Sequence, residues 1–180
     1  MGTIMNHFMV NMTGQTYELH DDNQNNKVVG RLYPREAFVW RQVGSVRQQL
    51  MFLNSQGNLH EVWINENNYP RPNRLVDCCD YPYSEEWIDG HLYKIFKMRR
   101  TMKVYTAGAR EWGTVAAGMF VATRDNSVGY EHPDWKLINY VKRTDGQWIK
   151  VTGDGYEHGF VDTGLSIASG YDSIPFYGSW

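Results

Sequence analysis

Histidines and cysteines are the side chains of this sequence best suited to metal or nucleophilic chemistry. A hydrolytic zinc site needs clustered His, Asp or Glu ligands, at spacings such as H-x-H or H-E-x-x-H. The six histidines do not pair at such a spacing; they stand at His7, His20, His60, His91, His132 and His158. We therefore predict no metal site, and no motif in the sequence indicates a cofactor.

The two cysteines are adjacent, at Cys78 and Cys79. Adjacent cysteines form only a strained ring disulfide, so we expect two free thiols. Cys79 precedes His132 in the order of nucleophile and base that a cysteine peptidase uses. Pro82 follows closely, however, and opposes the helix on which such a nucleophile would stand. We predict that the chain is not an enzyme and keep a cysteine peptidase using Cys79 and His132 as an alternative.

Aromatic residues among Asn, Asp and Gly suggest binding rather than catalysis. The stretch Ala122 to Lys136 reads ATRDNSVGYEHPDWK, which is too polar for a core strand. Flat apolar rings stack on sugars or short peptides, while amides and carboxylates orient them. The corresponding stretch Trp40 to Gln49 is shorter and basic, which leaves open whether both halves bind the same ligand. The predicted ligand-binding residues are Trp40, Trp112, Asp125, Asn126, Tyr130, Glu131, His132, Trp135 and Tyr156.

The elements that position these residues are predicted to be short strands. Aromatic residues make up 14% of the chain, with 17 glycines. Val, Ile, Thr, Tyr, Trp and Phe recur in short runs between Asn, Asp and Gly clusters, which is typical of small antiparallel sheets. The nearest approach to a helical stripe is EEWIDGHLYKIFKM, which Gly90 interrupts. We predict an all-β protein, with at most one helical turn near Ser84–Ile88.

The two halves of the chain share an order of features. A glycine opens an extended segment at Gly30 and again at Gly113, and an apolar triplet follows each after a short bend. Further on, LMFL at 50–53 parallels INYV at 138–141, and each is followed by a glycine-containing turn and a further strand. The pattern predicts an internal duplication.

The stretch between the halves reads NENNYPRPNRLVDCCD. Its two prolines, Pro70 and Pro72, resist both helix and central strand. We therefore predict a first domain over 1–75, a linker or inter-domain segment over 76–100, and a second domain with an aromatic C-terminal tail over 101–180.

A family resemblance rests on the second half. The stretches GQWIKV at 146–151 and GYEHGFVD at 155–162 resemble the bacterial SH3-like cell-wall-targeting domain, whose hairpin carries G-x-W-x-x-V and ends in G-W/F-V. In the first half Leu59 stands where Trp148 stands, and no clean G-W-V ending follows. The resemblance implies two small SH3-like barrels in tandem, joined by a Pro/Asn-containing linker. We place Trp148 and Phe160 in the core of the second.

The resemblance also implies a function. Domains of the family that this sequence resembles are non-catalytic modules that target phage endolysins and bacteriocin-type peptidoglycan hydrolases to the wall. The expected partner is bacterial cell-wall peptidoglycan or a secondary wall polymer, with a catalytic domain upstream in the full-length protein. The alternative is a phage or surface adhesion protein that binds a host glycan.

Charge and hydropathy limit the other classes of partner that the sequence predicts. The formal net charge is −2, so there is no basic field to recruit nucleic acid or anionic lipid. No apolar run approaches the roughly 20 residues of a membrane helix. The start, MGTIMNHFMVNM, lacks the pattern of a signal peptide. We expect an extracellular or cell-wall location, reached by another route or from a start further upstream.

Overall fold

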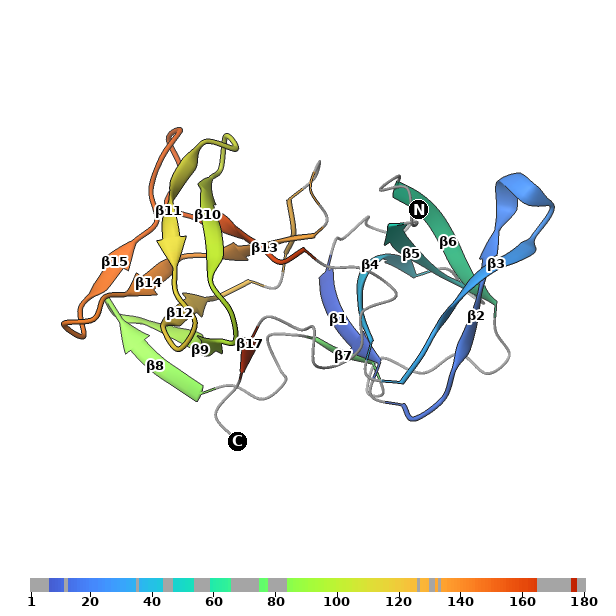
Figure 1. Ribbon diagram of the computed structural model, residues 1–180, viewed down its shortest axis with the longest axis horizontal. Helices are drawn as coiled ribbons and strands as arrows, with labels where there is room; N and C mark the ends of the chain where they lie inside the picture. Colours follow the sequence, from blue (N-terminus) through green and yellow to red (C-terminus); the bar gives the residue numbers. More distant parts are fainter. Residues whose placement is uncertain are drawn as a thin grey trace. The chain divides into compact units, whose positions relative to one another are not determined.

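The computed structural model describes residues 7–11, 13–34, 36–43, 47–53, 59–65, 75–77, 84–125, 127–129, 132, 134–164 and 176–177. The chain forms two compact units, Met1–Asp77 with Leu165–Ile174, and Cys78–Gly164 with Pro175–Trp180. Regular structure in the described ranges is almost entirely β, with no α-helix and a single 3-10 turn at Asp22–Gln24 (Figure 1). The prediction of an all-β protein is therefore confirmed.

The first unit is built on one antiparallel sheet in the order β3-β2-β6-β5-β4-β1-β7. Its strands are β1 (His7–Asn11), β2 (Tyr17–Asp21), β3 (Lys27–Leu32), β4 (Ala37–Val43), β5 (Arg47–Leu53), β6 (Leu59–Asn65) and β7 (Leu75–Asp77). Alternate residues of these strands meet in one core, as the period-two pattern requires. That core consists of Met9, Tyr17, Leu19, Leu32, Phe38, Leu50, Val62 and Ile64.

The second unit has two sheets. One runs β11-β10-β16-β13, and the other runs β15-β14-β12-β9-β17 with β8 also paired to β9. The strands are β8 (Ser84–Ile88), β9 (His91–Met98), β10 (Met102–Thr106), β11 (Glu111–Val115), β12 (Phe120–Thr123), β13 (Trp135–Ile138), β14 (Tyr140–Lys142), β15 (Trp148–Lys150), β16 (Gly159–Asp162) and β17 (Phe176–Tyr177). β17 brings the aromatic C-terminal segment back onto β9 of this unit.

The two units share one scheme of strand pairing. In the first, β1 pairs with β4, β4 with β5, β5 with β6, and β6 with β2, which forms a hairpin with β3. In the second, β9 pairs with β12, β12 with β14, β14 with β15, and β16 with β10, which forms a hairpin with β11. The order of the strands along the chain is the same in both.

The correspondence extends to single residues in the β2–β3 and β10–β11 hairpins. Leu19 faces Gly30 just as Val104 faces Gly113, and each hairpin shifts register directly after that pair. β2 and β10 also have the same sequence of buried, exposed and half-buried positions. The alignment of the two glycines is thus matched by the register. The alignment further on is displaced, because Leu50 occupies the place of Tyr140 rather than Ile138.

The units differ where the second has additional chain. β6 is one continuous strand, and its Val62 and Trp63 pair with β5 and β2 in succession. The corresponding strand of the second unit is split into β15 and β16, and residues 151–158 lie between the two parts. The connection from β4 to β5 covers 44–46, whereas the connection from β12 to β14, the counterpart of β5, covers 124–139 and contains the additional strand β13. Two segments are therefore particular to the second unit.

The segment 76–100, predicted to be a linker or inter-domain segment, instead contributes strands to the sheets: residues 76–77 belong to β7, and 84–88 and 91–98 form β8 and β9. In its described part, β8 and β9 form a hairpin, and β9 pairs along its other edge with β12. Asp89 and Gly90 both have positive φ, 47° and 79°, as a two-residue hairpin turn requires. The Asp-Gly pair is a turn signal between two strands, so the helical turn predicted near Ser84–Ile88 is also wrong.

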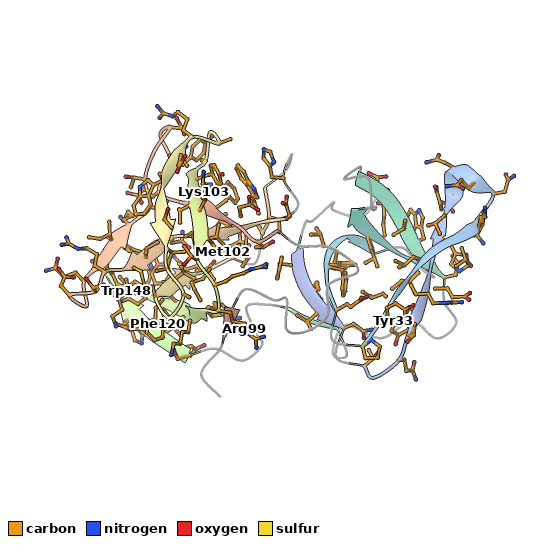
Figure 2. The ribbon with its side chains drawn as sticks, in the orientation of Figure 1. Tyr33, Arg99, Met102, Lys103, Phe120 and Trp148 are labelled. Carbon is orange, nitrogen blue, oxygen red and sulfur yellow. The ribbon has the colours of Figure 1, made fainter. Side chains whose placement is uncertain are left out.

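Trp148 lies on the face of a sheet rather than among the innermost side chains. It is half-buried and packs against a cluster of Ile88, Tyr93, Ile95, Ala122 and Tyr140. Its Nε1 donates to Glu86 Oε1 at 3.0 Å. The Nζ of Lys142 lies 5.2 Å from the Trp148 ring and 5.9 Å from the Phe120 ring, and Figure 2 labels both aromatic residues on this part of the unit. Trp148 therefore covers a second apolar cluster.

Candidate ligand-binding groove

A groove with a volume of about 540 Å³ opens in the second unit. Four of the lining residues are small: Ala107, Gly108 and Ala109 from the β10–β11 turn, and Gly129 from the β12–β13 connection. The other lining residues carry rings, which are His132, Trp135, Tyr156, His158 and Phe160. The groove therefore combines aromatic rings with residues that have no bulky side chain.

Trp135 is the centre of a stack of three rings. Its ring lies 4.2 Å from that of Tyr105 at an interplanar angle of 8°, and 3.9 Å from that of His132 at 17°. Two rings so close to one indole cannot share a face, so Tyr105 and His132 cover opposite faces. Trp135 is accordingly only 8% exposed. It holds the β12–β13 connection against β10 and presents little more than its edge to a ligand.

Three of the lining rings, an exposed Tyr156 and half-buried His158 and Phe160, stand at every second position of one segment. Tyr156, His158 and Phe160 lead into and along β16, and the period of two puts them on one side. Ring centroids are 5.3 Å apart for Tyr156 and His158 and 5.7 Å apart for His158 and Phe160. Tyr156 is 58% exposed. These three rings, with faces tilted against each other by 58° and 83°, are the available contact surface.

A tight turn brings this segment to the groove. Asp154 and Gly155 have φ of 57° and 83°, and Gly153 and Tyr156 exchange backbone hydrogen bonds of 3.2 and 3.0 Å. This is a two-residue turn with both φ values positive, for which Asp-Gly is favoured. It explains why the motif GDGYEHGFV ends in an extended aromatic segment.

Asp154 also connects its own turn to the β10–β11 turn. Its Oδ2 accepts from the Thr106 hydroxyl and, at 2.9 Å, from the Gly108 amide. Its Oδ1 lies 2.5 Å from Nη2 of Arg110. The hydrogen bond from Thr106, with help from Gly108 and Arg110, holds the pKa of Asp154 below its usual range. The carboxylate thus fixes the β10–β11 turn relative to the turn that carries Tyr156.

Lys136 supports the β12–β13 connection from inside. Its side chain is fully buried, and its Nζ donates to the backbone oxygen of Asp125 at 2.6 Å. The Thr123 hydroxyl donates to the same oxygen at 2.5 Å. The carboxylate of Asp125 caps its own loop, accepting from the amide and hydroxyl of Ser127 at 2.8 and 2.6 Å.

Two neighbouring carboxyl groups, those of Asp134 and Asp162, lie beside the ring stack. Asp134 precedes Trp135, and Asp162 faces Trp135 across the β13–β16 pairing. Burial raises the pKa of Asp134, and Asp162 raises it further through its charge and a hydrogen bond, while the Asp134 amide and His132 act in the opposite direction. The folded unit therefore binds a proton here more tightly than the unfolded chain does.

Asp134→Asn is expected to stabilise the second unit increasingly as pH rises. Because the pKa of Asp134 is raised in the folded state, its contribution to stability is present at acid pH and is lost as pH rises through that raised value. The difference in melting temperature between Asp134→Asn and the parent chain should widen from about pH 4 to about pH 7. Glu157→Gln, which removes a carboxylate whose side chain is 78% exposed, is the control. A difference for Asp134→Asn that is constant over this range would contradict the assignment.

The predicted site residues divide into three groups. His132, Trp135 and Tyr156 line the groove together. Trp112 lies half-buried on β11, and Trp40 packs against the core of the first unit. Asp125 lies at the base of the loop, and Asn126, Tyr130 and Glu131 lie outside the described residues.

Sequence reasoning missed part of the site. Phe160 was predicted for the core but lines the groove, as do His158 and Gly108, and Tyr105 supports Trp135. The alternation of Tyr156, His158 and Phe160 after an Asp-Gly turn was a usable signal. The neighbouring positions of β10, β16 and β13 that complete the stack carry no local signal.

Cys79, the nucleophile of the alternative peptidase, lies outside the described residues, and His132 stacks flat on Trp135. Across the described part of the chain, no three His, Cys, Asp or Glu side chains gather as metal ligands. The same ranges contain no helix with the length and hydrophobicity needed to cross a membrane.

Comparison with protein-family models, with curated proteins and with solved structures finds no match for this chain.

Proposed function

We propose that the chain is a non-catalytic module that binds bacterial cell-wall polymer, with the groove of the second unit as the binding site. The observation that carries the proposal is the aromatic groove. It combines rings, of which Tyr156 is well exposed, with Gly and Ala residues that leave room for a chain-like ligand. Such a combination suits the recognition of sugars or short flexible peptides.

The fold supports the same proposal. The shared pairing scheme of the two units, together with the GQWIKV and GYEHGFVD stretches, is consistent with two SH3-like barrels related by duplication. Part of the groove lining comes from chain that the first unit lacks: Tyr156 and His158 lie in 151–158, where β6 of the first unit is continuous, and Gly129 and His132 lie in the long β12–β13 connection. We assign binding to the second unit and propose that a hydrolase domain elsewhere in a longer protein would supply catalysis.

Sedimentation with purified bacterial cell walls tests the proposal. The chain is expected to co-sediment with walls of at least one species in a panel and to release no soluble fragments from them. Cys79→Ser should sediment equally well, because no cysteine is among the described residues that line the groove. Release of wall fragments that Cys79→Ser abolishes would instead establish the peptidase. A chain that stays in the supernatant with every wall would contradict the proposal.

A further inference from the structure

We infer that the groove recognises an uncharged glycan strand of linked N-acetylated sugars, rather than a peptide or an anionic secondary polymer. This inference rests on the proposed function and specifies which component of the wall is bound. It follows from three features of the groove: the charge of its lining, the orientation of its exposed rings, and the role of Trp135.

The described lining of the groove contains no Asp, Glu, Lys or Arg. The charged side chains next to Tyr156 and the β10–β11 turn are paired with each other. Arg110 lies 2.5 Å from Asp154, and Lys150 lies 3.3 Å from Glu157. A polymer with a phosphate in each repeat would need cations directed at it, as charge-assisted recognition of phosphate does. The groove offers such a polymer no unpaired Arg or Lys from its described lining.

The three rings along the Tyr156–Phe160 segment favour sugars over a peptide. An apolar C–H face of a sugar stacks on an aromatic ring, whereas a glycine-rich peptide has no comparable face. The three rings are tilted by 58° and 83° from one to the next, so one flat group cannot stack on all of them. Linked pyranose rings are rotated relative to each other at each glycosidic bond, and each can meet a differently oriented ring.

The three rings form one continuous surface. Centroids along Tyr156, His158 and Phe160 are separated by 5.3 and 5.7 Å. Trp135 is covered on both faces and contributes no stacking surface, so the ligand should lie along the Tyr156–Phe160 segment. The Gly and Ala residues of the lining leave space for the acetamido and hydroxymethyl groups.

Calorimetric titration of the full chain tests the inference with three soluble probes. These are a hexamer of β-1,4-linked N-acetylglucosamine, a glycine pentapeptide, and a glycerol-phosphate polymer. We expect the hexamer to bind and the other two to give no measurable heat of binding. Affinity for the hexamer should change by less than about twofold between low and high salt, because no ion pairs are formed with it.

Tyr156→Ala should weaken the hexamer roughly three- to tenfold, the loss expected for one aromatic stacking contact. Tyr33→Ala is the matched control, because Tyr33 is 49% exposed, lies in the first unit and is labelled in Figure 2. It should leave the affinity unchanged. Both substitutions are at exposed side chains, so melting temperatures should stay at the parent value and show that the fold is intact.

The outcomes separate the two proposals. Preference for the glycine peptide, or salt-sensitive binding of the phosphate polymer, would overturn the glycan inference. So would sedimentation with walls when none of the probes binds, or equal losses for Tyr156→Ala and Tyr33→Ala, while wall binding itself would stand. Absence of binding to both walls and probes would overturn the proposed function as well.

Discussion

Gly159→Ala is expected to destabilise the second unit by about 3 kcal/mol or more, the upper end for overpacking a close-packed site. Gly159 is the first residue of β16 and is paired with Thr106 on one side and Ile138 on the other. A Cβ at this position would lie 2.3 Å from the backbone oxygen of Tyr105 and 2.5 Å from a methyl of Val151. The carbonyl belongs to a paired strand, so it cannot move aside without breaking the sheet. The melting transition of this unit should fall by more than about 10 °C.

Gly113→Ala is the matched control for this substitution. Gly113 lies on β11 of the same sheet, opposite Val104. A Cβ there would meet no atom within 4 Å, and its backbone is not in the left-handed region. Alanine should be tolerated and can even stabilise slightly by restricting the unfolded chain. If both variants melted with the parent chain, the close approach of β16 to β10 would be refuted.

Local patterns in the sequence were sufficient for the strands. Alternating residues around Val104, Val115, Val151 and Val161 predict half-buried strands, and each of these four valines is fully buried. Hairpins were recognised where a Gly turn separates two alternating runs, as at Gly146. The same signal at Asp89-Gly90 was read as a break in a helix, because EEW and LYKIFKM also fit a helical spacing loosely. Strand pairing with β12 decides that ambiguity, and pairing is not a local property.

The candidate site was only partly predictable for a related reason. The polar, aromatic stretch between β12 and β13 indicated His132 and Trp135 through its composition. Their roles depend on Tyr105, which lies far away in the sequence and reaches Trp135 only because β10 and β13 flank β16. Composition indicates which side chains can stack on a ligand. It does not indicate which ring faces remain uncovered after the sheet has formed.

Phe38→Ala is expected to destabilise the first unit by about 3–5 kcal/mol, the usual cost of removing a buried aromatic side chain. Phe38 is 1% exposed and belongs to the core with Leu19, Leu50 and Ile64. Calorimetry should show the transition of the first unit shifted to a lower temperature or lost. The transition of the second unit and the proposed binding of wall polymer by its groove should be retained, since every described groove residue belongs to the second unit.

Val28→Ala is the control for Phe38→Ala, because Val28 is 39% exposed on β3 of the same unit. It should change neither transition by more than about 0.5 kcal/mol, as is usual for an exposed position. Loss of groove binding in Phe38→Ala, with the second transition intact, would show that the first unit takes part in recognition. Retained binding would support the proposal that recognition belongs to the second unit, whose described groove residues all lie outside the first.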